Sequence, residues 1–410
     1  MTRRLAALWL LSALVALGLP LLADEAYYLD WSRHPALGYF DHPPGIALWV
    51  GAGLGHPRLL GVLLFPLTAW LLGRAAVAWG AAEANRFPEL VLGTPIGLAG
   101  TALATPDAPL LPVVAGLLLA LGRRRFGRVG LLLGVALWIK PTALLMLPAL
   151  LLIARRNALR VLAPAVVVIA PHLGWSMMND GLPYSFQAQR LGAGMNTPEF
   201  LLGQLAVVTP GLAWLSLRAL KQATTGEPPG EDRALLLLAG SQLGIWLAAS
   251  GVARVEANWP AFAWLPAILL LARRAPEGLA TARTWALGLT AATGVGVVVA
   301  GSVLPPGLGP PRDPEALSAC APPEISPVAP RYQEAALLAA AGRRVPYIGL
   351  SGGRRSQYDR WGDRPVGPTC DYTYLAAPER LPMACPGPVE AIALCGRPAT
   401  RCRCPGGLVR

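Results

Sequence analysis

The chain has 410 residues, of which 54% are hydrophobic and only 14% are charged. Soluble domains carry about 25% charged residues, so this chain has too little charge to cover a soluble globule, and its surplus apolar surface indicates a membrane protein. The formal net charge is +12. Because the basic residues lie between apolar runs and form no soluble basic face, the charge argues against nucleic acid as a partner and favours a topological signal.

The first apolar run covers residues 5–22 and follows two arginines. It is similar to a signal peptide, but no small-residue cleavage site is clear before Asp24, so we expect an uncleaved first span. Further apolar runs lie between residues 58 and 304, several of them shorter than the roughly 20 residues that a straight span needs. Residues 129–154 can form one long helix or two short ones that meet at Pro141. The runs therefore predict ten or eleven transmembrane helices.

The loops between these runs alternate in positive charge. If the N-terminus is cytoplasmic and every run spans, the inner loops hold the arginine clusters at 123–128 and 155–160, and the outer loops hold only isolated basic residues. This asymmetry predicts a cytoplasmic N-terminus. Eleven spans then place the tail outside the cytoplasm, as its cysteines also indicate, so we favour about eleven helices within a transmembrane domain of residues 1–304.

The tail differs in composition from the rest of the chain. Residues 305–330 are rich in proline and are expected to be a linker, and residues 331–410 are expected to form a small extracytoplasmic, cysteine-rich α/β domain. The six cysteines are Cys320, Cys370, Cys385, Cys395, Cys402 and Cys404. Disulfides persist outside the cytosol, so we expect at least two here, in a pairing that the sequence leaves open. A zinc site of four thiolates is the alternative, because the tail has no histidine.

The segment 23–57 is expected to be an outer catalytic loop. Asp24 and Glu25 directly follow an apolar helix, at a membrane edge where a carboxylate is poorly hydrated and tends to be functional. Such a group can accept a proton from a hydroxyl nucleophile. The alternative is a solvated loop whose aromatic residues form an interfacial belt, and for Asp30 this structural interpretation is favoured.

Three further positions carry charge beside apolar runs. Asp107, between two prolines, is expected at the outer end of a helix, as a site acid, an N-cap or both. Lys140 interrupts a strongly apolar stretch, where a lone lysine is costly and phosphate is its natural partner; the alternative is snorkelling to the interface. Arg190 can be a second phosphate clamp or an exposed loop arginine. We expect Asp24, Asp107 and Lys140 to converge on one cavity.

Several familiar motifs do not occur. The sequence has no Walker A loop, no Gly-rich dinucleotide fingerprint and no HExxH. ATP-driven transport is therefore not expected. An extracytoplasmic site without a nucleotide-binding domain indicates a sugar donor that is carried by a lipid.

A set of motifs in a fixed order is more specific than any of these features alone. The motifs are Asp24-Glu25-Ala-Tyr-Tyr, Gly38-Tyr-Phe-Asp41-His42-Pro-Pro, Thr105-Pro-Asp107-Ala-Pro, Lys140-Pro-Thr, Glu256-Ala-Asn258-Trp-Pro, Arg331-Tyr-Gln and Gly352-Gly-Arg-Arg-Ser-Gln-Tyr358. Between about residues 20 and 360 the chain thus resembles the bacterial protein-mannosyltransferase-like glycosyltransferases of the GT-C fold, family 39, and their aminoarabinose-transferase relatives.

The resemblance implies a polyprenyl-phosphate sugar as donor and inversion at the anomeric carbon. It implies that the acidic pair at 24–25 includes the catalytic carboxylate and that Asp41 and His42 lie by the donor phosphate. His42 stands where aminoarabinose transferases carry lysine, and it can bind phosphate or, with Asp41, a divalent metal. Lys140 is similar to a family lysine that contacts phosphate. Asn258 and Tyr358 belong to matching motifs and are expected to bind substrate.

Together these observations predict an α-helical polytopic enzyme of the bacterial inner membrane. It is expected to be an inverting glycosyltransferase that moves a sugar from a polyprenyl-phosphate donor to a lipid, glycan or protein hydroxyl outside the cytoplasm, in contact with membrane lipids. No cofactor is certain, and a divalent metal is possible. The alternative is a flippase or transporter for a lipid-linked sugar, which needs intramembrane charges and lipid grooves but no carboxylate pair in a long outer loop.

Overall fold

The computed structural model describes residues 2–188, 194–225 and 227–303 and, in the C-terminal part, 327–328, 332–340, 355–361, 372–374, 389–394 and 397–402. The chain divides into two compact units. The first unit consists of Met1–Ala16 and Ala36–Gly296. The second consists of Leu17–Pro35 and Val297–Arg410.

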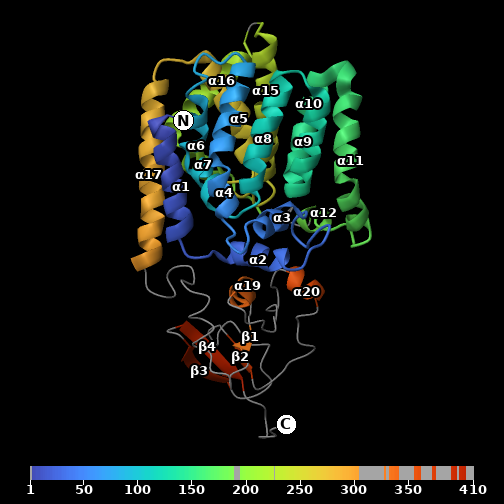
Figure 1. The fold of residues 1–410 in the computed structure, drawn as a ribbon, viewed down its shortest axis with the longest axis vertical. Coiled ribbons are helices and arrows are strands. Elements are labelled where there is room, and N and C mark those ends of the chain that lie inside the picture. The colour runs from blue at the N-terminus through green and yellow to red at the C-terminus, as the bar shows by residue number, and fades with distance from the viewer. Residues whose placement is uncertain are drawn as a thin grey trace. The chain divides into compact units, whose positions relative to one another are not determined.

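The described part of the first unit is helical (Figure 1). Its elements are α1 (Arg3–Gly18, which continues into the second unit), α3 (Gly45–Ala52), α4 (Leu59–Leu63), α5 (Phe65–Ala78), α6 (Phe87–Leu92), α7 (Pro95–Ala102), α8 (Asp107–Gly122), α9 (Phe126–Ile139), the 3-10 helix η1 (Pro141–Met146), α10 (Leu147–Ala154), the 3-10 turn η2 (Arg155–Asn157), α11 (Ala158–Met177), α12 (Tyr184–Ala188), α13 (Thr197–Val208), α14 (Pro210–Ala223), α15 (Gly230–Ser250), α16 (Ala261–Arg274) and α17 (Leu279–Val303, which also continues into the second unit).

The core of this unit is built around α16. All of its residues from Ala261 to Ala272 are buried, which suits a helix that is apolar all round and therefore has no face for water. It packs against α14 and α15. Figure 1 shows α8, α9 and α11 running side by side, in the order in which α8 contacts α9 and α9 contacts α11.

Prolines set the breaks at one end of α8 and α9. Helix α8 begins directly after Pro106, and its axis turns by 111° from that of α7. Helix α9 ends before Lys140, whose backbone is extended at φ −146° and ψ 123°. A residue before proline is pushed out of the helical region, so Pro141 ends α9 and begins η1.

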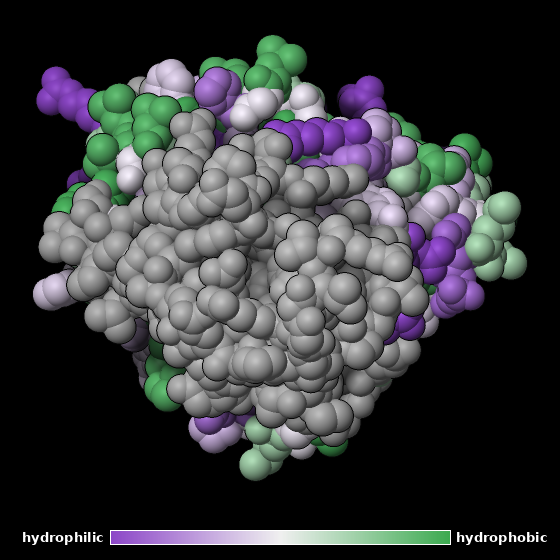
Figure 2. Space-filling view, turned by 90° about the horizontal axis from the view of Figure 1, so that it is seen from below, coloured by the Kyte–Doolittle hydropathy of each residue, from purple (hydrophilic) through white to green (hydrophobic). Residues whose placement is uncertain are grey.

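Three helical stretches among the described residues are long and apolar enough to cross a membrane, namely Pro141–Met177, Gly230–Ser250 and Leu279–Gly301. The count rises to six if each of three sharply bent helix pairs is one span. Large apolar side chains also stay exposed on these helices, for example Val167 at 73% and Trp285 at 68%. In Figure 2, hydrophobic residues in green lie beside hydrophilic ones in purple along the coloured rim. The chain is a polytopic membrane protein, as expected, whereas the count of eleven spans stays a prediction.

The described part of the second unit combines helices with a small sheet. The helices are α2 (Ala23–Ser32), α19 (Tyr332–Ala340) and α20 (Gln357–Trp361). The strands β1 (Pro327–Val328), β2 (Tyr372–Tyr374), β3 (Val389–Leu394) and β4 (Arg397–Cys402) form a sheet of order β1-β2-β4-β3. Strand β1 pairs with β2 in parallel, and the pairs of β4 with β2 and with β3 are antiparallel. Helix α19 packs against α2.

Two expectations for the tail lie outside the described residues. Only the backbone of Cys402 is described among the six cysteines, so the disulfide and zinc predictions cannot be compared with the structure. The expected linker 305–330 is described only at residues 327–328.

Candidate active site

In the first unit, three of the residues singled out from the sequence form a buried polar cluster. The Lys140 ammonium lies 2.7 Å from Asp107 Oδ1, and the Asn258 amide donates to Asp107 Oδ2 at 2.7 Å. Asp107 and Lys140 are each only 4% exposed. The ammonium also lies 5.9 Å from the centre of the Phe262 ring, within the range of a cation–π contact.

The order of the helices explains why Asp107 and Lys140 meet. Asp107 is the first residue of α8, and Lys140 directly follows the last residue of α9. A short turn joins the two helices, which pack against each other, so the start of α8 lies beside the end of α9. The carboxylate is thereby also placed at the positive end of the α8 dipole.

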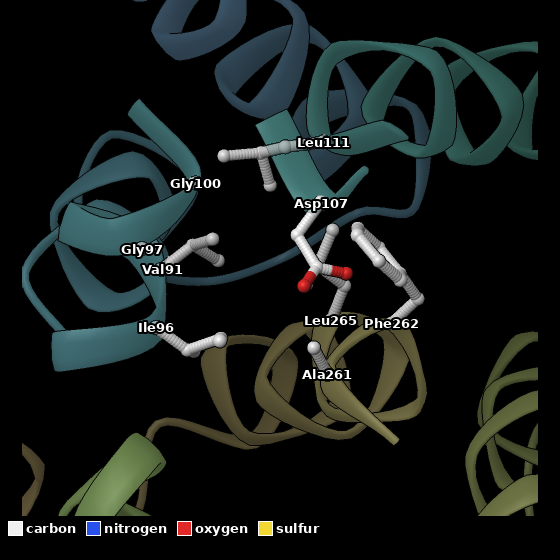
Figure 3. Close-up of a pocket in the computed structure, with 9 residues that line it drawn as sticks. All are labelled: Val91, Ile96, Gly97, Gly100, Asp107, Leu111, Ala261, Phe262 and Leu265. Carbon is white, nitrogen blue, oxygen red and sulfur yellow. The ribbon is translucent and has the colours of Figure 1, made fainter. Parts of the chain in front are cut away.

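The surroundings of the carboxylate are apolar. Figure 3 shows Asp107 among side chains of α6, α7, α8 and α16, with Val91 of α6 and Leu111 on one side and Phe262 and Leu265 on the other. The cavity between them has a volume of about 20 Å³, which is room for about one water molecule. The site thus admits little water, so charges in it interact more strongly than they would in bulk water.

The Lys140 ammonium has hydrogen-bond donors to spare. An ammonium carries three donors, and among the residues that the structure describes only Asp107 accepts from this one. The remaining donors can serve an incoming anion. Asp107, which also accepts from the Asn258 amide, holds the ammonium in place.

A buried glutamine that the sequence did not single out supports the loop before α16. The Gln204 side chain of α13 donates to the Ala257 carbonyl at 3.1 Å and accepts from the Trp264 indole at 3.0 Å. Ala257 directly precedes Asn258, so Gln204 supports the backbone that carries the amide bound to Asp107. Its sequence signal is a single glutamine within the apolar run 199–219.

The loop that carries Asp41 and His42 is docked onto α9 and α11. The His172 ring donates through Nδ1 to the Leu37 carbonyl at 2.7 Å. A Cβ added to Gly45 would lie 2.7 Å from the Trp138 carbonyl oxygen and 2.9 Å from Ile139 Cα. No side chain fits there, so glycine lets the end of this loop approach the segment directly before Lys140.

Burial of this loop also affects its aromatic residues. Desolvation raises the pKa of Tyr39 to about 12 and that of Tyr184, on α12, to about 12. Gln187 of the same helix donates to the Asp41 carbonyl at 3.1 Å, and Phe186 lies 5.0 Å from Phe40 between ring centres. Helix α12 therefore holds the Asp41 backbone in place.

In the second unit, the two acids at the start of α2 differ in environment. Glu25 is buried, and its Oε2 accepts the Leu22 amide at 2.9 Å, as in a capping box. Asp24 is exposed, and its Oδ1 accepts from the Tyr332 hydroxyl at 3.1 Å. Glu25 thus has a structural role at the helix start, and Asp24 presents its carboxylate to the surface.

Aromatic rings pack around α2 in this unit. The Tyr27 ring centre lies 4.8 Å from that of Tyr332 and 5.5 Å from that of Tyr358. The Tyr27 hydroxyl accepts the Gln357 amide at 2.5 Å. Tyr358, expected to bind substrate, is therefore buried against α2 by its own unit.

Two sequence expectations, a phosphate contact from Arg190 and a metal at Asp41 and His42, stay predictions. Arg190 lies outside the described residues. Within the described ranges, no group of three or more His, Cys, Asp or Glu side chains is arranged to hold a metal ion, so the possible metal at Asp41 and His42 gains no third ligand from them.

Comparison with known proteins places the fold. No family model matches the sequence. The lipid A galacturonosyltransferase RgtD of Rhizobium johnstonii is 30% identical over 295 residues, which are 62% of this chain and 62% of RgtD. The match thus spans less than two thirds of that relative.

Solved structures cover more of the chain at lower identity. ArnT from Cupriavidus metallidurans bound to undecaprenyl phosphate has a TM-score of 0.61 at 15% identity, over 97% of this chain and 96% of ArnT. Its apo structure has a TM-score of 0.59 over the same shares. The chain therefore has the fold of ArnT, so the fold expected from the aminoarabinose-transferase relatives, the GT-C fold, is confirmed.

Proposed function

We propose that this chain is an inverting glycosyltransferase that takes its sugar from a polyprenyl-phosphate donor. The observation that carries the proposal is the buried Lys140 ammonium, which Asp107 holds in place and which has donors to spare, while Asn258 donates to Asp107. A fixed cation in a dry site stabilises negative charge that develops on a leaving group. The ArnT structure with bound undecaprenyl phosphate has the same fold, which supports a polyprenyl phosphate as that leaving group.

In the proposed reaction, Asp24 is the general base. Its carboxylate accepts the proton of an acceptor hydroxyl as the hydroxyl oxygen bonds to the anomeric carbon. The bond from that carbon to the phosphate oxygen breaks, and polyprenyl phosphate leaves with the electron pair. Lys140 stabilises the phosphate. We assign the base to Asp24 and not to Glu25 because Glu25 caps the α2 helix.

Other residues are proposed to complete the donor site. Asp41 and His42 lie on the loop that docks beside the end of α9, which supports a place for them near the donor phosphate, with a divalent metal as a possible bound group. Asn258 orients Asp107. Arg190 is proposed as a second phosphate contact and Tyr358 as a contact to substrate in its own unit.

The acceptor is proposed to be a glycolipid of the lipid A type, because RgtD is named for a transfer to lipid A. Glycan and protein hydroxyls are the less supported acceptors. We further propose a location in the bacterial inner membrane with about eleven spans, a cytoplasmic N-terminus, and an extracytoplasmic α/β domain at 331–410 after the linker 305–330.

The decisive experiment compares two neighbouring acids. Cells that lack the protein are complemented with wild type, Asp24→Asn or Glu25→Gln, and their envelope glycolipids and glycoproteins are analysed by mass spectrometry. Wild type should add one sugar mass to a glycolipid. Asp24→Asn should reduce this product by about 10²–10⁴ in rate, the range for general-base catalysis. Glu25→Gln should keep it, since glutamine also serves in a capping box.

Lipid binding by purified protein, compared with sugar transfer in cells, distinguishes an enzyme from a transporter. Purified Asp24→Asn protein should still bind undecaprenyl phosphate as wild type does, because the carboxylate acts on the acceptor. A sugar product that persists in Asp24→Asn cells would contradict the proposed base. A wild type that binds the lipid but adds no sugar to any envelope component would favour a flippase.

A further inference from the structure

A second polar site lies at the other end of α8 from Asp107. The helix has 16 residues, so its two ends are about 24 Å apart at 1.5 Å per residue. At this far end, α5, α8 and α9 form a groove with a volume of about 320 Å³. Leu71, Gly116 and Leu132 line its apolar part, and Arg123, Arg125 and Arg128 line its end.

The three arginines have no counter-charge in the described part of the chain. They are exposed and make no ion pair with any residue that the structure describes. The sequence has no Asp or Glu between residues 108 and 179, so neither α8 nor the helices that directly follow it supply one. An anion is therefore the ligand that this end of the groove suits.

The apolar part of the groove matches a lipid chain in length. Its lining on α8 extends from Pro112 to Arg123, which is about 16 Å along the helix axis. One leaflet of a bilayer has a hydrocarbon depth of about 15 Å, half of the whole core. A chain lying in the groove would thus reach from the middle of the membrane to its surface, with the arginines at headgroup level.

We propose that this groove is a binding site for one anionic phospholipid, whose phosphate contacts Arg123, Arg125 and Arg128 and whose acyl chain lies over Gly116 between Leu71 and Leu132. Basic pockets between transmembrane helices bind anionic headgroups in this way. The site is separate from the Asp107–Lys140 cluster, and the inference does not depend on the proposed function.

The test titrates the purified full-length protein with phosphatidylglycerol and, as a neutral comparison, phosphatidylcholine, and follows the bound lipid by native mass spectrometry. Wild type should retain one phosphatidylglycerol in preference to phosphatidylcholine. The triple variant R123Q/R125Q/R128Q should lose about a hundredfold in affinity, since each arginine near a membrane surface contributes roughly fivefold. Inorganic phosphate at millimolar concentration should not displace the lipid, because it has no chain.

A matched variant separates a site from general surface charge. R155Q/R156Q/R160Q removes the same charge from the next basic turn, which does not line the groove, and should retain phosphatidylglycerol as wild type does. Equal losses in both triple variants would overturn the proposal. Gly116→Leu fills the groove from its floor, where a Cβ has only ordinary contacts with Leu132 at 3.5 Å. Gly116→Leu should also lose the lipid while unfolding at the wild-type temperature. If this variant retained phosphatidylglycerol, the proposed position of the acyl chain would be wrong.

Discussion

Variants of the buried Asp107–Lys140 pair can separate a structural role of Lys140 from a functional one. Lys140→Met removes the ammonium and leaves a carboxylate buried without its cation. Removing one partner of a buried pair costs about 3–5 kcal/mol. We expect about 3 kcal/mol here, at the lower end, because Asn258 still donates to Asp107 at 2.7 Å.

The double variant Asp107→Asn/Lys140→Met removes both charges and keeps similar side-chain volumes. A neutral replacement of a buried ion pair is often neutral or stabilising, so this variant should lie within about 1 kcal/mol of wild type. Unfolding in mixed micelles of mild detergent and SDS measures both free energies. A double variant as unstable as Lys140→Met would refute the pairing argument.

The same double variant tests the phosphate role without the confounding effect of misfolding. If Lys140 contacts phosphate, the double variant should be folded but bind undecaprenyl phosphate about 10- to 100-fold more weakly, as expected for the loss of a charge-assisted hydrogen bond. Wild-type affinity in a folded double variant would mean that Lys140 serves only the fold. This result would leave the fold intact and remove the main support for the proposed donor site.

Three further predictions follow from other parts of the molecule. Gly45→Ala should destabilise the protein by about 1–3 kcal/mol through overpacking against the end of α9. The control Gly174→Ala, with nothing within 4 Å of its Cβ, should not destabilise it. Equal unfolding midpoints for the two variants would contradict the close approach of Gly45 to α9. The Tyr39 pKa of about 12 lies above its ordinary value of 10.0, so the neutral phenol stabilises the fold below pH 10. This contribution to the free energy of unfolding, about 2 kcal/mol, should be lost as the pH rises toward 12. Tyr39→Phe should flatten the pH dependence of the free energy of unfolding, and an unchanged pH profile would speak against the buried phenol. Peptide mapping without reductant should find at least two disulfides in the tail, and recovery of six free thiols from native membranes would favour zinc.

The sequence by itself determined the class of the protein and where its charges stand. Composition alone requires a membrane, because apolar surface on this scale has no other solvent. Asp107 and Lys140 stood out because Asp107 lies between two apolar runs and Lys140 interrupts one, and a charge at such a position is a functional candidate from the local sequence alone. The order of the motifs was enough to predict the fold that the comparison with ArnT confirms.

Only the tertiary structure decided which groups are partners. Asn258 reaches Asp107 across 151 positions in the chain, and His172 reaches Leu37 across 135. Such pairs depend on which helix faces meet. Helices that are apolar on every side, such as α16, carry no amphipathic pattern from which a facing side can be read. The different environments of the adjacent acids Asp24 and Glu25 also appear only in the structure, where Glu25 accepts the Leu22 amide at the start of α2 and Asp24 is exposed.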